Sequence, residues 1–264
     1  MLSWLKVITF ENGDIPKVND STFDIAPTTK ELLSYGDELD LTIEKVKLSD
    51  SGYRMVKNNK FELFIDVGHV GASYQPAHVH SDTFNFILYV KKQPVFVDTG
   101  VSTYDKNQLR QKERSTASHN TVQIENYEQT EVWGGFRVAK RAKIIHLNES
   151  QNSIEASHDG FTNIGCIHKR NFSWNKECII IKDNISKSTQ SQAKAFFHLH
   201  SNIKKPKVSN GIVFLEDENL QIDFKGYKDI IIDKYELSHG FNKREFAYKI
   251  IVTFDDYLQS KISL

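Results

Sequence analysis

Two histidines and an aspartate stand directly in front of an apolar run near residue 80 of this 264-residue chain. The stretch reads PAHVHSDTFNF and carries His78, His80 and Asp82 at the entrance to what is predicted to be a buried strand. Imidazole and carboxylate groups bind divalent metal ions and also transfer protons. If His78–Val79–His80 is extended, both imidazoles lie on one face, because side chains alternate along a strand. Both rings could then bind one ion, or one could bind while the other faces a substrate.

Two further residues are expected at the same end of the sheet. The run FNFILYV should form a hairpin with PVFVDTG through the turn KKQP, and antiparallel pairing then places Asp98 beside the two histidines. A long polar loop leaves from that end and returns at SHNTVQIE, so His119 begins the next strand. Two imidazoles and one carboxylate, with one position left open, suit a tetrahedral ion such as zinc. The alternative is a polar sheet edge whose side chains bond to loop backbone.

The elements that must position these residues are strands. From about residue 60 the sequence consists of short runs rich in Ile, Val, Phe and Tyr, separated by turn residues, with almost no helical periodicity. This pattern predicts a mainly β fold, a large antiparallel β-sandwich of two or more stacked sheets, or a barrel. The runs are KFELFIDVG, FNFILYV, PVFVDTG, NTVQIE, AKIIHL, CIIIKDNIS, KAFFHLH, GIVFLED, LQIDFKG, DIIIDKYEL and YKIIVTFDD.

Residues 1–45 differ from the rest of the chain. The segment from Thr28 to Leu39 has leucines at helical spacing after a threonine that can cap a helix, and turn residues precede it. We therefore predict a short helical or irregular lead-in over 1–45 and one β-domain over 46–264. The segment STYDKNQLRQKERSTASHN is predicted to be a long polar loop between two strands, and loops of this length are often functional.

The bulk composition excludes some partners. Thirty-four basic residues balance thirty-four acidic ones, so no net field favours binding to nucleic acid. No apolar stretch approaches the roughly 20 residues of a membrane-spanning helix, and the start MLSWLKVITF lacks a secretory leader. We expect a periplasmic protein if a signal peptide precedes this sequence, and a cytoplasmic one otherwise. The two cysteines, Cys166 and Cys178, are expected to be unbridged buried thiols.

The sequence around the histidines resembles a known family. The run FIDVGHVGASYQPAHVHSDTFNFILYVKKQPVFVDTGVSTYD, followed by RSTASHNTVQIENYEQTEVWGGFR, is similar to the C-terminal domain of heparinase II/III-type polysaccharide lyases. The shared pattern is His-x-His-x-Asp, then a strand ending in VDTG, then STASHNTV and a Q-x-E-x-W segment. Further similarity occurs in SHDGFTNIGCIHKRNFSW and KAFFHLHSN, so most of the chain is covered.

The resemblance implies a fold, a cofactor and a reaction. Members pair an (α/α) toroid with a β-sandwich that carries zinc, and they cleave uronic-acid polysaccharides by β-elimination. Carried over residue by residue, the metal ligands are His80, Asp98 and His119. His78 matches a position that faces the active-site cleft, and it is the candidate catalytic residue, which would contact the substrate carboxylate or share in proton transfer. The alternative is that His78 orients His80 or caps the strand. Residues 1–45 would be a remnant of, or junction to, the helical domain. We expect the chain to be inactive without that domain, its N-terminal partner.

Two residues of the long loop are candidates for binding the acidic polysaccharide or oligosaccharide. Tyr104 lies in VSTYD and Arg114 in KERSTASHN. A guanidinium group can pair with a sugar carboxylate through two parallel hydrogen bonds. A solvated loop position is the alternative for each of these side chains.

Rival functions belong to other classes. A cupin-like metalloenzyme also uses His-x-His, but it needs a glutamate a few residues later, and SDTFNF supplies none. A non-catalytic carbohydrate-binding sandwich in which zinc only joins loops has all its metal positions filled by protein or fixed water. A role in bacterial surface-polysaccharide metabolism is a third possibility.

Overall fold

The computed structural model describes residues 1–48, 51–187 and 191–264 and confirms a mainly β, antiparallel fold with a short helical lead-in. The helices are α1 (Leu2–Ile8), α2 (Thr29–Glu38) and α3 (Gln108–Glu113). The strands are β1 (Tyr53–Lys57), β2 (Phe61–Asp66), β3 (Phe86–Val90), β4 (Gln93–Phe96), β5 (Val122–Ile124), β6 (Val132–Trp133), β7 (Arg137–Val138), β8 (Ile144–Ser150), β9 (Ser153–His158), β10 (Cys166–Trp174), β11 (Cys178–Lys187), β12 (Ala193–His198), β13 (Lys207–Ser209), β14 (Ile212–Leu215), β15 (Leu220–Gly240) and β16 (Lys243–Ser263).

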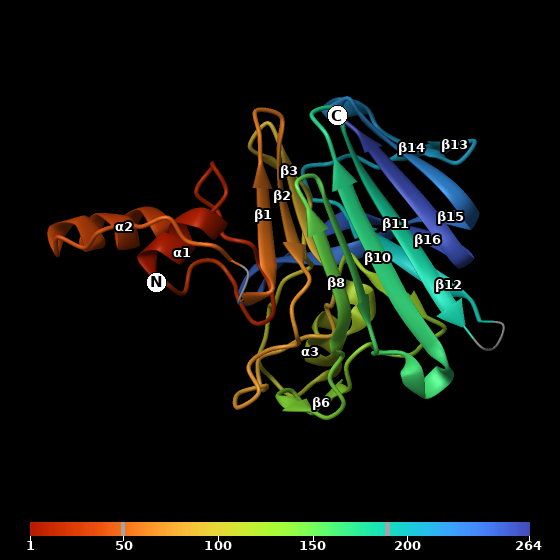
Figure 1. Cartoon of the computed structure of the whole chain (residues 1–264), viewed down its shortest axis with the longest axis horizontal. Coiled ribbons are helices and arrows are strands. Elements are labelled where there is room, and N and C mark those ends of the chain that lie inside the picture. The colour runs from red at the N-terminus through yellow and green to blue at the C-terminus, as the bar shows by residue number, and fades with distance from the viewer. Residues whose placement is uncertain (49–50, 188–190) are drawn as a thin grey trace.

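Within the described residues the strands form two main sheets and a small ribbon. A four-stranded sheet has the order β1-β2-β3-β4. A ten-stranded sheet has the order β13-β14-β15-β16-β11-β10-β9-β8, and β12 joins it by pairing with β16 and with β5. Strands β6 and β7 form the ribbon. Figure 1 shows the smaller sheet facing the larger one, with α1 and α2 standing to the side of β1.

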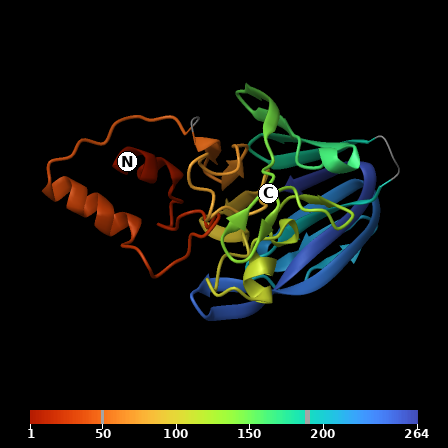
Figure 2. The same ribbon diagram turned by 90° about the horizontal axis from the view of Figure 1, so that it is seen from below.

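The central strands of the smaller sheet, β2 and β3, are buried along their whole length, which explains their mainly apolar sequences. Leu63 of β2 belongs to the main core shared with the large sheet, whereas its neighbour Phe64 packs in a second cluster with Ile8 and Phe10 of the lead-in. Strands covered on both sides lose the alternation of apolar and polar residues. Figure 2 shows the lead-in as a lobe beside the sheets, part of which returns to the sandwich.

The lead-in helix begins where the sequence predicts. Thr28 caps α2 through a capping box, in which its hydroxyl accepts from the Glu31 N–H and the Glu31 carboxylate accepts from the Thr28 N–H. Each partner thereby satisfies a donor that the first helical turn leaves unpaired. No helix in the described part of the chain is long and apolar enough to cross a membrane.

Several predictions about local structure need correction. The loop expected over 102–120 contains α3 and the short 3-10 turn Thr116–Ser118. The runs LQIDFKG and DIIIDKYEL are one strand, β15, with register shifts between Lys225 and Asp229. Strands β1 and β9 were not predicted, because their polar residues mask the strand pattern. Both cysteines are free, as predicted, although Cys178 is only partly buried.

Candidate functional site

A buried histidine–carboxylate pair lies just beyond the end of β4. Asp98 follows that strand, and its Oδ2 accepts hydrogen bonds from His119 Nδ1 at 2.7 Å and from Asn85 Nδ2 at 2.7 Å. Its Oδ1 accepts from the Gly100 N–H at 2.9 Å. Burial by itself would raise the pKa of Asp98, but the neighbouring His119 and these hydrogen bonds hold that pKa below its usual value. The hairpin geometry therefore brings Asp98 and His119 together as predicted.

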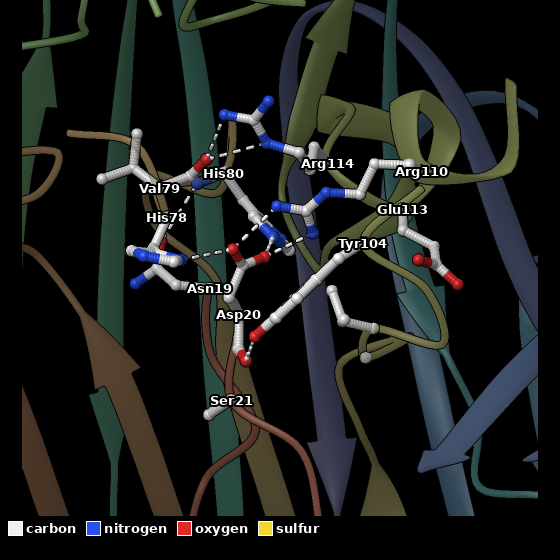
Figure 3. A network of polar contacts seen from close by, with 12 residues as sticks. Asn19, Asp20, Ser21, His78, Val79, His80, Tyr104, Arg110, Glu113 and Arg114 are labelled. Atoms are coloured by element: carbon white, nitrogen blue, oxygen red, sulfur yellow. Dashed lines mark hydrogen bonds and ion pairs between the residues drawn. The ribbon is translucent and has the colours of Figure 1, made fainter. Parts of the chain in front are cut away.

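A second carboxylate, Asp20 of the lead-in, joins the two histidines of the HVH segment (Figure 3). Its Oδ2 accepts from His78 Nδ1 at 2.8 Å, and its Oδ1 accepts from His80 Nε2 at 2.9 Å. The guanidinium of Arg110 on α3 bonds to both oxygens, with Nη2 2.7 Å from Oδ2. Burial would raise the pKa of Asp20, but the hydrogen bonds from His80 and Arg110 hold it well below the usual range. This carboxylate is therefore ionised.

The lead-in is anchored to the sandwich on both sides of Asp20. Asn19 adopts a positive φ of 53°, and its side-chain oxygen accepts from the His80 N–H at 3.0 Å. Lys17 is buried, and its Nζ donates to the Ser238 carbonyl at 2.6 Å. Burial lowers the pKa of Lys17 to about 8. An irregular segment that buries an ionised carboxylate and an amine in this way has a defined position on the sandwich.

Three buried atoms of types that bind metal ions lack a hydrogen-bond partner among the described residues: His80 Nδ1, His119 Nε2 and Asp82 Oδ2. The rings of His80 and His119 have centroids 5.3 Å apart. Two imidazoles bound to one tetrahedral zinc have ring centres about 5 Å apart, given zinc–nitrogen bonds of about 2 Å. The donor types and this spacing fit a divalent cation. Even so, no group of three or more His, Cys, Asp or Glu side chains in the described ranges forms a ready-made metal cage.

Two more carboxyl groups lie buried beside the histidines. Burial raises the pKa of Asp82, and the charge of Asp98 adds to this effect. Burial also raises the pKa of Asp66 well above its usual value, with the charge of Asp82 as the next cause. Carboxyl groups in this position are neutral unless positive charge is supplied nearby. The excess of buried acid is a second reason to expect a cation here.

Comparison with known proteins gives the family. A sequence profile described as heparinase II/III-like, C-terminal, matches residues 42–263. This chain belongs to the heparinase II/III-like C-terminal family. A search of curated proteins found no significant match.

Two solved lyase structures share the fold of this heparinase II/III-like domain. The heparan sulfate lyase HepC from Pedobacter heparinus is 16% identical to this chain, with a TM-score of 0.74. The match covers 98% of this chain and 45% of the HepC chain. Heparinase III, in a crystal structure, is 14% identical to this chain, with a TM-score of 0.72. The match covers 98% of this chain and 47% of the heparinase III chain. The chain therefore spans a little under half the length of these lyases.

In this heparinase II/III-like domain the HVH segment differs from its predicted geometry. Residues 76–85 are irregular rather than extended. His78 keeps 54% of its side chain exposed, whereas His80 has 0% exposed. Both rings nevertheless reach one carboxylate, because each uses a different nitrogen to bond Asp20. His78 is thus the residue of the pair that solvent and ligands can reach.

The two loop residues predicted to bind sugar lie in different surroundings. Tyr104 is partly exposed at 37%, and its hydroxyl donates to the Asp20 carbonyl at 3.1 Å. Arg114 is fully buried, and it donates to the carbonyls of Val79 and Gly135. Arg114 therefore supports the backbone between the two histidines, and contact with an acidic sugar stays a prediction for both residues.

Asp20 and Arg110 are the members of the site that sequence reasoning missed. Asp20 lies in the turn-rich stretch VNDS, 58 residues before His78, and it follows no spacing rule with the histidines. Arg110 lies in the segment read as a polar loop, although its guanidinium is fully buried. The one available signal was the length of that loop, since long loops in compact domains often carry function.

The buried acid of the site predicts a pH effect in protein kept metal-free with a chelator. Asp82 has a raised pKa in the folded state, so its contribution to stability is complete below the unfolded pKa of about 4 and is lost as pH rises. Asp82→Asn removes this loss. The variant should therefore gain stability relative to the parent as the pH rises above about 4, by at most about 1.4 kcal/mol per pH unit. Urea unfolding across that range measures the difference, and a constant difference would contradict the assignment.

Proposed function

We propose that this chain is the C-terminal sandwich of a polysaccharide lyase that cleaves uronic-acid-containing polysaccharide by β-elimination. Membership of the heparinase II/III-like family supports this proposal, as does the fold shared with two lyases over slightly less than half their length. The remainder of such an enzyme would be a helical domain, and we propose that this sandwich requires that domain for catalysis.

The observation that carries the proposal is the exposed imidazole of His78, fixed by a buried ion pair. In β-elimination a base removes the proton on C5 of the uronic acid, and an acid protonates the departing O4. The sugar carboxylate beside C5 must also be neutralised, because negative charge develops there in the transition state. His78 bonds Asp20 through Nδ1 and is half exposed, so its Nε2 is the nitrogen that can meet the sugar. As a neutral imidazole it can accept a proton at Nε2, and as an imidazolium it can donate from Nε2 to the sugar carboxylate.

We further propose zinc as the resident cation. His80 and His119 would hold it through Nδ1 and Nε2, the buried nitrogens that lack other partners, together with the carboxylate of Asp98 or Asp82. When bound, the cation supplies positive charge to a site crowded with buried carboxylates and joins three chain segments. The three segments that carry His80, Asp98 and His119 lie at the edge of the site, beside His78.

The test compares the 264-residue chain with protein expressed from its full reading frame. Each is incubated with acidic polysaccharides and with neutral polysaccharides of similar size as the control. We expect the longer protein to release oligosaccharides with a C4–C5 double bond, detected by ultraviolet absorbance, and His78→Ala to reduce this release strongly. The chain alone should release none. Binding of acidic glycan by both proteins without any unsaturated product would favour a non-catalytic binding module instead.

A further inference from the structure

Asp20 makes an unusually complete set of contacts for a residue in an irregular segment. Its side chain is 5% exposed and accepts from three side chains through four hydrogen bonds. Figure 3 shows it at the centre of the network, with His78 on one side and the ring of His80 and the guanidinium of Arg110 on the other. The guanidinium of Arg110 is fully buried and always charged, so the carboxylate opposite it is ionised and can only accept hydrogen bonds.

The two histidines use opposite nitrogens toward this acceptor. His78 approaches Asp20 with Nδ1, and His80 approaches it with Nε2. Because the carboxylate donates nothing, each of these nitrogens must carry the proton. In a neutral imidazole the other nitrogen is then a bare lone pair. That nitrogen is Nε2 on His78, whose side chain is half exposed, and Nδ1 on His80, which is buried without a partner.

We infer that Asp20 is a positioning residue that fixes His78 and His80 in opposite tautomers. The lone pair on His78 Nε2 is then available to solvent, and the lone pair on His80 Nδ1 belongs to the buried atoms without partners, with His119 Nε2 and Asp82 Oδ2. Asp98 acts in the same way on His119, because it accepts from Nδ1 and leaves Nε2 without a partner. Histidines that bind metal usually donate their second nitrogen to a carboxylate, which sets the tautomer and orients the ring.

The consequence is that the lead-in completes the site. Asp20 lies outside residues 42–263, the part of the chain that matches the family profile. The anchors on either side of it, at Lys17 and Asn19, hold the carboxylate in reach of both histidines. Fixing the tautomers is independent of the proposed function, whereas the effect on zinc binding rests on it.

The test uses the whole chain labelled with 15N-histidine and compares it with Asp20→Asn. An asparagine has nearly the same shape, but its amide accepts at one end only, so it cannot accept from both rings. The matched control is Asp24→Asn, which removes an exposed carboxylate of the same segment that pairs with Lys243. Imidazole 15N shifts at about pH 8.5, where ordinary imidazoles are neutral, report the tautomer of each ring. Spectra of His78→Ala and His80→Ala assign the signals.

We expect the parent and Asp24→Asn to show His78 protonated at Nδ1 and His80 protonated at Nε2, and Asp20→Asn to reverse at least one ring. Zinc affinity, measured by competition with a chelator, should fall about 10- to 100-fold in Asp20→Asn and be unchanged in the control. The opposite tautomer on either ring of the parent would overturn the inference, even if Asp20→Asn does not fold. Equal zinc affinity in parent and Asp20→Asn would also overturn it. If the parent binds no zinc, the proposal of a resident zinc ion is wrong. The tautomers measured from the imidazole 15N shifts then test the role of Asp20 by themselves.

Discussion

Replacement of Arg170 by methionine is expected to lower the free energy of unfolding by about 3 to 5 kcal/mol. Arg170 on β10 is fully buried, and its Nε and Nη2 donate to the two oxygens of Asp183 at 2.6 and 3.0 Å. Its Nη1 donates to the carbonyls of Phe84 and Asn120 at 3.0 and 2.8 Å. Methionine leaves the Asp183 carboxylate buried without its cation, and it leaves both carbonyls unsatisfied.

The matched control for this substitution is an arginine on the surface. Arg244 pairs with Glu236 at 2.8 Å, and both side chains are 37% exposed, so Arg244→Met should cost no more than about 1 kcal/mol. The double variant Arg170→Met, Asp183→Leu should recover part of the loss, because no unpaired charge is then buried. Urea unfolding of the four proteins measures these differences. Equal losses for Arg170→Met and Arg244→Met would show that burial of the Asp183 pair does not govern its energy.

Arg170 also links the core to the site, because the backbone whose carbonyls it binds flanks the site residues. Asn120 follows His119, and its side chain donates to the carbonyls of Phe86 and Val97. Asn85, next to Phe84, donates to Asp98. The segments that carry the histidine–carboxylate pair are therefore held by buried polar groups from β10 and from the residues that precede β3 and β5. Loss of Arg170 should accordingly weaken the site as well as the core.

The pairing of Asp98 with His119 could be predicted from sequence because it depends on short-range rules. One hairpin fixes which end of β3 lies opposite the end of β4, and the loop that follows must return to that end. Alternating apolar residues marked most of the strands for the same reason. Both signals arise between residues that are close in sequence, and this is the range over which residue propensity and hydrophobic periodicity act.

The position of Asp20 could not be predicted in this way. Its contacts to His80 and Arg110 span 60 and 90 residues, and they connect a turn-rich segment to a loop and a short helix. Neither segment has a periodicity that fixes which of its faces is buried. The docking instead depends on tertiary contacts, namely those of the buried amine of Lys17 and the side-chain oxygen of Asn19. Strand β9 was missed for a related reason, since polar residues such as Ser157 and His158 are buried within it.

The purified chain is expected to bind about one zinc ion, and His80→Ala or Asp98→Ala should lose it. His80 contributes a buried nitrogen with no other partner, and Asp98 fixes His119 even where it does not itself touch the ion. An ion that binds only the folded state stabilises it, by about 2.7 kcal/mol when its free concentration is 100 times the dissociation constant. Zinc should therefore raise the unfolding free energy of the parent and have no such effect on either variant.

The control for zinc binding is His146→Ala, because this histidine has 52% of its side chain exposed and pairs only with Glu155 among the described residues. The His146→Ala variant should bind zinc with the same affinity as the parent. Comparison of Asp82→Ala with Asp98→Ala identifies the third ligand, since loss of a direct ligand weakens binding more than loss of a carboxylate that acts through His119. Elemental analysis gives the stoichiometry, and unfolding with zinc or with a chelator gives the stabilisation. A stable parent that is metal-free and unaffected by added zinc would mean that the unpartnered nitrogens of His80 and His119 serve another ligand.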